Sequence, residues 1–193
     1  PATSRQLFSS GNPAHEMTVL VVDAKSKREQ PDGEIGEIWL AGPSVTSGYW
    51  KRESVNAEVF GATLADGDPA EKFLRTGDLG FIHDGEVYVT GRSKDVVILR
   101  GRNLFPQDIE ATVKGLLQAN VLQCAAVATT GRTGDALTVA AEVSRHVDSE
   151  ELPDIVRHIR RAIIDDHEVD ARQVLITRPG GIPLTTSGKV QRQ

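Results

Sequence analysis

Cysteine is almost absent from this chain of 193 residues, which contains Cys124 alone. A single thiol cannot close an internal disulfide, so the chain is not a small domain held together by disulfides. Cys124 lies inside the apolar run 121–127, and apolar surroundings favour a buried, inert thiol over a reactive one. We therefore expect Cys124 to pack in a core.

An excess of basic residues is also missing. The 22 Lys and Arg are outnumbered by 27 Asp and Glu, which gives a formal net charge of -5. Non-specific nucleic-acid binding needs a basic surface that displaces counterions from phosphates, so no nucleic-acid partner is expected. A composition that is 39% hydrophobic and 25% charged is that of an ordinary globular protein.

Long apolar runs are lacking as well. No stretch approaches the length of a membrane span, and residues 1–6 have no apolar core of a signal peptide. We therefore expect no membrane span and a cytoplasmic location. The start at Pro1, without an initiator Met, indicates a piece of a longer protein.

Several catalytic signatures are absent. The five histidines show no HExxH or other metal-ligand spacing, so no metal site is predicted. Neither GxGxxG nor GxSxG occurs, which weakens dehydrogenase and hydrolase interpretations. Ser187-Gly188-Lys189 is not a P-loop, because Pro183 and Val190 stand where that motif needs Gly and Ser or Thr.

What is present in the first half reads as strands separated by turns. β-branched and apolar residues predict strands over 17–23, 36–41 and 96–99. Strands 79–83 and 86–90 flank Asp84-Gly85, the dipeptide that a tight type I′ turn requires, so a hairpin is predicted there.

The pattern changes after Gly101. A helix is predicted to begin at Pro106, where the missing N–H is tolerated, and a second near Asp148, which with Glu151 resembles a capping box. Strands are expected over 121–129, 136–143 and 174–177.

The change from strands alone to strands mixed with helices places a domain boundary at residues 92–101. We predict an α+β protein: a β-rich terminal layer of a larger N-terminal domain over 1–93, then a small α+β C-terminal domain over 94–193.

Three polar segments interrupt these patterns with residues suited to phosphate or ribose. In 75–78, Asp78 follows a Gly turn and could accept hydrogen bonds from a ribose diol, although Thr-Gly-Asp is also common in plain turns. Segment 91–95, with 100–103 after it, could equally be a solvated linker. The loop 183–192 carries small donors and Lys189, and could wrap an anionic group.

The order and spacing of these segments resemble the C-terminal motifs of the adenylate-forming superfamily, which includes acyl-CoA synthetases, luciferases and peptide-synthetase adenylation domains. The resemblance covers nearly the whole chain and rests on the segments 33–38, 42–44, 48–50, 73–80, 91–95 and 183–192. Within this superfamily, residues 97–110 most resemble the corresponding segment of the fatty acyl-AMP ligases. Acyl-CoA synthetases usually carry Lys where this chain has Ile98 and a Gly-Gly-Glu-Asn-like loop where it has Arg100-Gly101-Arg102-Asn103.

The resemblance implies a two-step reaction. In the first step a carboxylate is joined to the α-phosphate of ATP, with Mg²⁺ accompanying the nucleotide. By this resemblance Asp78 holds the ribose hydroxyls, Arg92 contacts the ribose or phosphate side, and Lys189 bridges the carboxylate and α-phosphate oxygens.

In the second step the acyl group passes to a thiol after the small domain rotates about a hinge, matched here by Lys94 with Asp95 adjacent. The residues of the acceptor-step loop would be Ile98, Arg100, Gly101, Arg102 and Asn103.

The function implied is activation of a fatty acid as acyl-AMP and transfer to the phosphopantetheine thiol of an acyl carrier protein. An acyl-CoA synthetase that uses free CoA, or a non-catalytic homologue that binds acyl groups or carriers, stays open as an alternative. Because the phosphate-gripping loop, the adenine pocket and the fatty-acid tunnel of these enzymes lie upstream, this stretch alone is expected to be inactive.

Overall fold

A computed structural model of the chain describes residues 7–99, 101–116, 120–131 and 134–192. The chain divides into two compact units between Lys94 and Asp95. The boundary expected from the sequence lies one residue earlier, after Ser93. That boundary stays a prediction for the domains of the longer protein.

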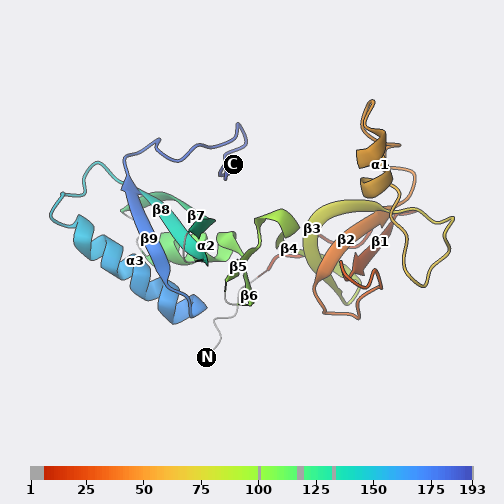
Figure 1. Cartoon of the computed structure of the whole chain (residues 1–193), viewed down its shortest axis with the longest axis horizontal. Helices are drawn as coiled ribbons and strands as arrows, with labels where there is room; N and C mark the ends of the chain where they lie inside the picture. Colours follow the sequence, from red (N-terminus) through yellow and green to blue (C-terminus); the bar gives the residue numbers. More distant parts are fainter. Residues whose placement is uncertain (1–6, 100, 117–119, 132–133, 193) are drawn as a thin grey trace. The chain divides into compact units, whose positions relative to one another are not determined.

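The first unit is built on a four-stranded antiparallel sheet with strand order β1-β2-β3-β4 (Figure 1). Each strand pairs with the one before it in the chain, so the sheet is a simple meander. The strands are β1 (Thr18–Val22), β2 (Gly36–Ala41), β3 (Leu74–His83) and β4 (Glu86–Arg92).

The predicted hairpin between β3 and β4 is confirmed. His83 pairs with Glu86, and the two residues between them, Asp84 and Gly85, have φ angles of 50° and 80°. Positive φ at both central positions is the property that makes Asp-Gly suited to a type I′ turn. The sequence signal and the turn geometry therefore agree.

The first unit has a small apolar core. Val22, Trp39 and Phe73 are almost fully buried, and the rings of Trp39 and Phe73 lie 6.2 Å apart between centroids. A short helix, α1 (Glu53–Val59), was not predicted from the sequence. It has no buried residue, so no apolar periodicity marks it.

The second unit begins with a 3₁₀ turn, η1 (Ser93–Asp95), that spans the division, and continues as an α+β arrangement. A small hairpin precedes a sheet of order β7-β8-β9, in which β7 and β8 are antiparallel and β8 and β9 parallel. Helix α3 makes the crossover between the two parallel strands. The elements are β5 (Val97–Leu99), β6 (Arg102–Leu104), α2 (Pro106–Leu116), β7 (Val121–Gly131), β8 (Gly134–Val143), α3 (Leu152–His167) and β9 (Ala171–Thr177).

One apolar core joins the helices and strands of this unit. Ile109 and Val113 of α2 and Ile159 and Ile163 of α3 are completely buried against the sheet. Cys124 is part of this core, and burial raises the pKa of its thiol to about 12. The prediction of a buried thiol is confirmed, and the raised pKa disfavours its reactive thiolate form.

Helix α2 begins at Pro106 as predicted. The predicted capping box at the start of α3 is wrong in one respect: the helix begins at Leu152, with Pro153 in its first turn, and Asp148 does not cap it. Only one half of the box forms, since the backbone N–H of Asp148 donates to Oε1 of Glu151 at 3.1 Å. The proline sets the helix start because it needs no N–H partner there.

Candidate functional site

Asp78 and Arg92 are brought together by strand register. They are direct partners on the neighbouring strands β3 and β4, and Nε of Arg92 lies 2.9 Å from Oδ1 of Asp78. Both side chains keep solvent access, with 67% of Arg92 and 33% of Asp78 exposed. Two residues chosen from separate motifs therefore form one polar pair.

The Asp78 carboxylate retains capacity to bind a ligand. An ionised carboxylate offers about four acceptor positions. Arg92 occupies Oδ1, and Oδ2 has no hydrogen bond to any residue within the described ranges. A ribose diol could therefore donate to Asp78 while Arg92 stays beside it.

Glu37 holds the turn that carries Asp78, and the sequence did not predict it as a site residue. Glu37 is 4% exposed. Its Oε2 accepts hydrogen bonds from Nε1 of Trp39 at 3.1 Å and Nε of Arg75 at 3.0 Å. Its Oε1 accepts from the backbone N–H of Gly77 at 3.2 Å. Both oxygens are therefore engaged in holding the turn.

Thr76 completes this support. Its hydroxyl donates to the carbonyl of Ile38 at 2.7 Å and accepts from the backbone N–H of Asp78 at 3.0 Å. Gly77 has a φ of 72°, which favours glycine over residues with a Cβ. Thr-Gly-Asp is thus a preorganised turn joined to strand β2.

Lys94 and Asp95 lie in η1, directly after β4. The hydroxyl of Ser93 donates to the carbonyl of Gly77 at 3.1 Å, so the end of β4 is tied to the Thr-Gly-Asp turn. Lys94 closes the first unit and Asp95 opens the second. The predicted hinge residues therefore stand on either side of the division.

The predicted acceptor-step loop is the β5–β6 hairpin. Ile98 pairs with Asn103 and is 61% exposed, whereas its neighbours Val97 and Leu99 are buried. Gly101 has a φ of 78°, and Arg102 donates to Oε2 of Glu168 at 2.6 Å. Arg100 lies outside the described residues.

Lys189 lies near the end of a tight turn formed by residues 183–191, which we call the Lys189 turn. The expected loop is closed by hydrogen bonds: the N–H of Thr185 donates to the Lys189 carbonyl at 2.8 Å, and the N–H of Lys189 to the Thr185 hydroxyl at 3.0 Å. Lys189 itself is exposed, and its ammonium pairs with none of the residues that the structure describes.

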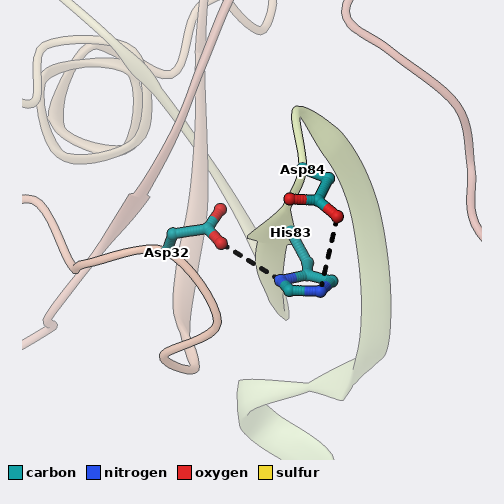
Figure 2. A group of neighbouring side chains, drawn as sticks. All are labelled: Asp32, His83 and Asp84. Atoms are coloured by element: carbon teal, nitrogen blue, oxygen red, sulfur yellow. Dashed lines mark hydrogen bonds and ion pairs between the residues drawn. The ribbon is translucent and has the colours of Figure 1, made fainter.

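One group of metal-binding residue types occurs within the described part of the chain: Asp32, His83 and Asp84, all exposed (Figure 2). Nδ1 of His83 faces Asp32 at 3.1 Å, and Nε2 faces Asp84 at 3.7 Å. The candidate ligand atoms lie within 4.8 Å of one another, but the two carboxylates face different nitrogens of the imidazole. The geometry is that of ion pairs around a histidine.

The helices offer no membrane span. The longest among the described residues, α3, has 16 residues, and none combines the length and apolarity that crossing a bilayer requires.

Comparisons with known proteins agree with this arrangement. Residues 94–193 match the family described as "Disco-interacting protein 2-like, AMP domain", and residues 2–50 match "AMP-binding enzyme". The chain therefore belongs to the adenylate-forming superfamily of AMP-binding enzymes. Within that superfamily it is similar to the fatty acyl-AMP ligases.

Two curated relatives illustrate the similarity. The chain is 41% identical over 191 residues to the medium-chain-fatty-acid–[acyl-carrier-protein] ligase JamA of Moorena producens, covering 97% of this chain and 32% of JamA. It is 38% identical over 195 residues to the long-chain-fatty-acid–AMP ligase FadD26 of Mycobacterium tuberculosis, covering 97% and 33%. The chain thus spans about a third of the length of the relatives it matches.

A solved structure gives the same view of the fold. ATP-bound MatB from Rhodopseudomonas palustris superposes with a TM-score of 0.75 at 26% identity, covering 95% of this chain and 34% of MatB. The predicted α+β fold of the adenylate-forming superfamily is confirmed.

Proposed function

We propose that the longer protein containing this chain is an ATP-dependent ligase that activates a fatty acid as acyl-AMP and passes the acyl group to an acyl carrier protein. The proposal rests on the pairing of Asp78 with Arg92 over a preorganised turn, in a chain 41% identical to a fatty-acid–[acyl-carrier-protein] ligase. ATP-bound MatB, which shares the fold, supports ATP as the co-substrate.

In the first step, Asp78 accepts hydrogen bonds from the ribose hydroxyls and Arg92 binds on the ribose or phosphate side. Lys189 supplies a positive charge to the carboxylate and α-phosphate oxygens, where negative charge gathers as the new bond forms. Its ammonium suits this task, because among the described residues it has no ion-pair partner to leave first. Positioning and electrostatic stabilisation are what such a step needs from a protein.

Mg²⁺ accompanies the ATP phosphates in this proposal. The Asp32, His83 and Asp84 group does not fit it, because Mg²⁺ prefers a near-octahedral set of oxygen ligands and these carboxylates face opposite nitrogens of the imidazole. No residue of this chain is assigned as a magnesium ligand.

In the second step, the unit that begins at Asp95 turns about Lys94 and the acyl group moves to a thiol. A phosphopantetheine thiol on a carrier protein is the proposed acceptor. Ile98 supports this choice: it is apolar and exposed on the β5–β6 hairpin, at the position where acyl-CoA synthetases usually carry lysine. Position 98 therefore offers no charge to the phosphates of free CoA, although Arg102 stands on the facing strand of the hairpin.

The test is to measure the two half-reactions separately in the longer enzyme. Lys189→Ala should slow fatty-acid-dependent pyrophosphate release from ATP by about 10²-fold, on the order of removing one preorganised donor. Transfer from preformed acyl-AMP to the carrier should change far less. Lys72→Ala, which alters an exposed lysine outside these segments, serves as the matched control.

The outcomes separate the alternatives. A protein that releases no pyrophosphate with any fatty acid is the non-catalytic homologue. Efficient acyl-CoA formation with free CoA identifies the acyl-CoA synthetase. Equal loss in both half-reactions of Lys189→Ala contradicts the role given to this lysine.

A further inference from the structure

Arg192 stands immediately after the Lys189 turn and points back into the unit. Its Nη2 lies 2.8 Å from each carboxylate oxygen of Glu110 on α2, and its Nε lies 3.3 Å from Oε1. Its Nη1 lies 3.4 Å from Oδ2 of Asp95, the first residue of the unit. One guanidinium therefore connects the end of the Lys189 turn to a helix and to the predicted hinge.

The burial of this cluster distinguishes it from ordinary surface ion pairs. The side chain of Arg192 is 21% exposed and that of Glu110 only 10%. Oε1 of Glu110 also accepts the backbone N–H of Ala126 on β7 at 2.9 Å, so the carboxylate is joined to the sheet. A planar, fixed fork of donors against a partly desolvated carboxylate gives a defined geometry that a flexible lysine would not reproduce.

The N-terminal end of the Lys189 turn is held in a similar way to the C-terminal end at Arg192. Ile182, one residue before the turn, is 5% exposed, and its backbone N–H donates to Oε1 of the buried Glu142 at 2.6 Å. Within the turn, the N–H of Gln191 donates to the Pro183 carbonyl at 2.9 Å, which brings the two ends of the turn together. Each end of the turn is thus fixed to a carboxylate of the core.

We infer that Arg192 is a positioning residue for the Lys189 turn, and that its contact with Asp95 makes the position of the turn sensitive to the hinge. Lys189 has a long exposed side chain, so the placement of its ammonium depends on where the turn is held. The Asp95 contact is the longest in the cluster, and Asp95 belongs to the predicted hinge, so a change of its backbone angles would displace this carboxylate. The inference rests on the proposed role of Lys189 in adenylation.

A simpler role for Arg192 is to fasten the chain end and stabilise the fold. The two roles differ in what they predict. Positioning acts through Lys189, so its loss affects the step that uses Lys189 and has no further effect once Lys189 is gone. Stabilisation affects both half-reactions and acts independently of Lys189.

The experiment uses the longer enzyme with Arg192→Gln, Lys189→Ala and the double variant. Arg192→Gln should slow adenylation by about 10-fold to 10²-fold, the scale expected for displacing a catalytic group by about 1 Å. The double variant should be no slower than Lys189→Ala alone. Transfer from preformed acyl-AMP should be unchanged. Arg161→Gln, which removes an exposed arginine paired with Asp165 on α3, is the control.

Two further measurements report on structure directly. Hydrogen exchange at the amides of Thr185, Lys189 and Gln191 should accelerate in Arg192→Gln, because these N–H groups close the Lys189 turn. Cys124 should stay unreactive toward a thiol reagent, which shows that the core is intact. Arg192→Lys and Glu110→Gln should give the same selective loss, and they replace Arg192→Gln if that variant does not fold.

Each failure has its own meaning. If Lys189→Ala slows adenylation and Arg192→Gln does not, the inference is wrong and the proposed function stands. If the effects of the two substitutions multiply, or if both half-reactions fall with Cys124 exposed, Arg192 only stabilises the fold. If Lys189→Ala leaves adenylation intact, the proposed role of Lys189 is wrong, and the inference about Arg192 is wrong as well.

Discussion

The guanidinium of Arg92 lies 2.9 Å from the carboxylate of Asp78, although 14 positions of sequence separate the two residues. The type I′ turn at residues 84–85 folds β3 onto β4, and a register shift between Leu79 and Gly80 then makes Asp78 and Arg92 partners. The turn at one end of the hairpin and the register shift along it together fix the spacing of two polar groups proposed to bind nucleotide at the other end. The remaining acceptor capacity of Asp78 leads to the first prediction.

Asp78→Asn in the longer enzyme should raise the KM for ATP by about 10-fold to 10²-fold, the worth of a hydrogen bond to a charged acceptor. Stability should hardly change, since the ion pair with Arg92 is largely exposed. Initial-rate measurements at varied ATP and a thermal melt check the two parts. Asp66→Asn, which breaks the exposed pair with Arg28, is the control and should leave the KM unchanged.

Glu37→Gln should destabilise the first unit by about 1–3 kcal/mol. The amide keeps one acceptor oxygen but turns an NH₂ group toward the donors of Trp39, Arg75 and Gly77. The loss stays below that for a fully buried pair because Arg75 is 35% exposed.

Urea unfolding followed by tryptophan fluorescence measures this change, since Trp39 is buried whereas Trp50 is 86% exposed. Breaking the Arg28–Asp66 pair instead, by Arg28→Gln, should cost less than about 1 kcal/mol. Equal effects of the two substitutions would show that Glu37 is not an anchor.

The sequence was informative where local chemistry decides structure. Asp84-Gly85 predicted its turn and Pro106 its helix start, because positive φ and a missing N–H are properties of those residues alone. Ile155, Ile159 and Ile163 recur at helical spacing in the sequence, and they are the buried residues of α3. Helix α1 lacks such a stripe and β6 is largely polar, so neither gave a signal.

The supporting residues of the candidate site could not be predicted in the same way. Glu37 is the one charged residue in the otherwise apolar strand 36–41, and nothing local reveals that its carboxylate meets Gly77, 40 residues later. Arg192 and Glu110 are 82 residues apart. Such pairs are determined by tertiary packing, whereas Asp78, Arg92 and Lys189 stand in short motifs that the sequence displays.

The hinge prediction concerns Lys94. Lys94→Pro in the longer enzyme should leave adenylation largely intact while transfer to the carrier falls steeply. Proline fixes φ near -65° and restricts the residue before it, Ser93, which here lies in a 3₁₀ turn. A hinge must change these angles between states, so the substitution should trap one of them.

Lys94→Ala is the matched control, because alanine removes the ammonium and keeps the backbone free. Separate single-turnover assays of the two half-reactions make the measurement. Undisturbed transfer in the proline variant would refute the hinge. A steep loss of transfer in the alanine variant as well would assign the effect to the charge of Lys94.

The last prediction is a pH dependence at the contact between α2 and α3. Nε2 of His167 lies 2.9 Å from the hydroxyl of Thr112, which is also 3.3 Å from Asp166. Burial lowers the pKa of His167 below its ordinary value, against the opposing effect of Asp166 and Asp108. Between the lowered folded pKa and the unfolded value of about 6.5, the unfolded chain therefore binds more protons than the folded one. It follows that stability rises with pH through this window and is lost as pH falls below about 6.5.

Unfolding of the chain in urea at pH 7.5 and pH 5.5 should show a lower free energy of unfolding at pH 5.5, and His167→Gln should reduce that difference. His158→Gln, which alters an exposed histidine of the same helix, is the control. A pH difference that is the same in His167→Gln as in the unmodified chain would place its origin in the carboxylates instead.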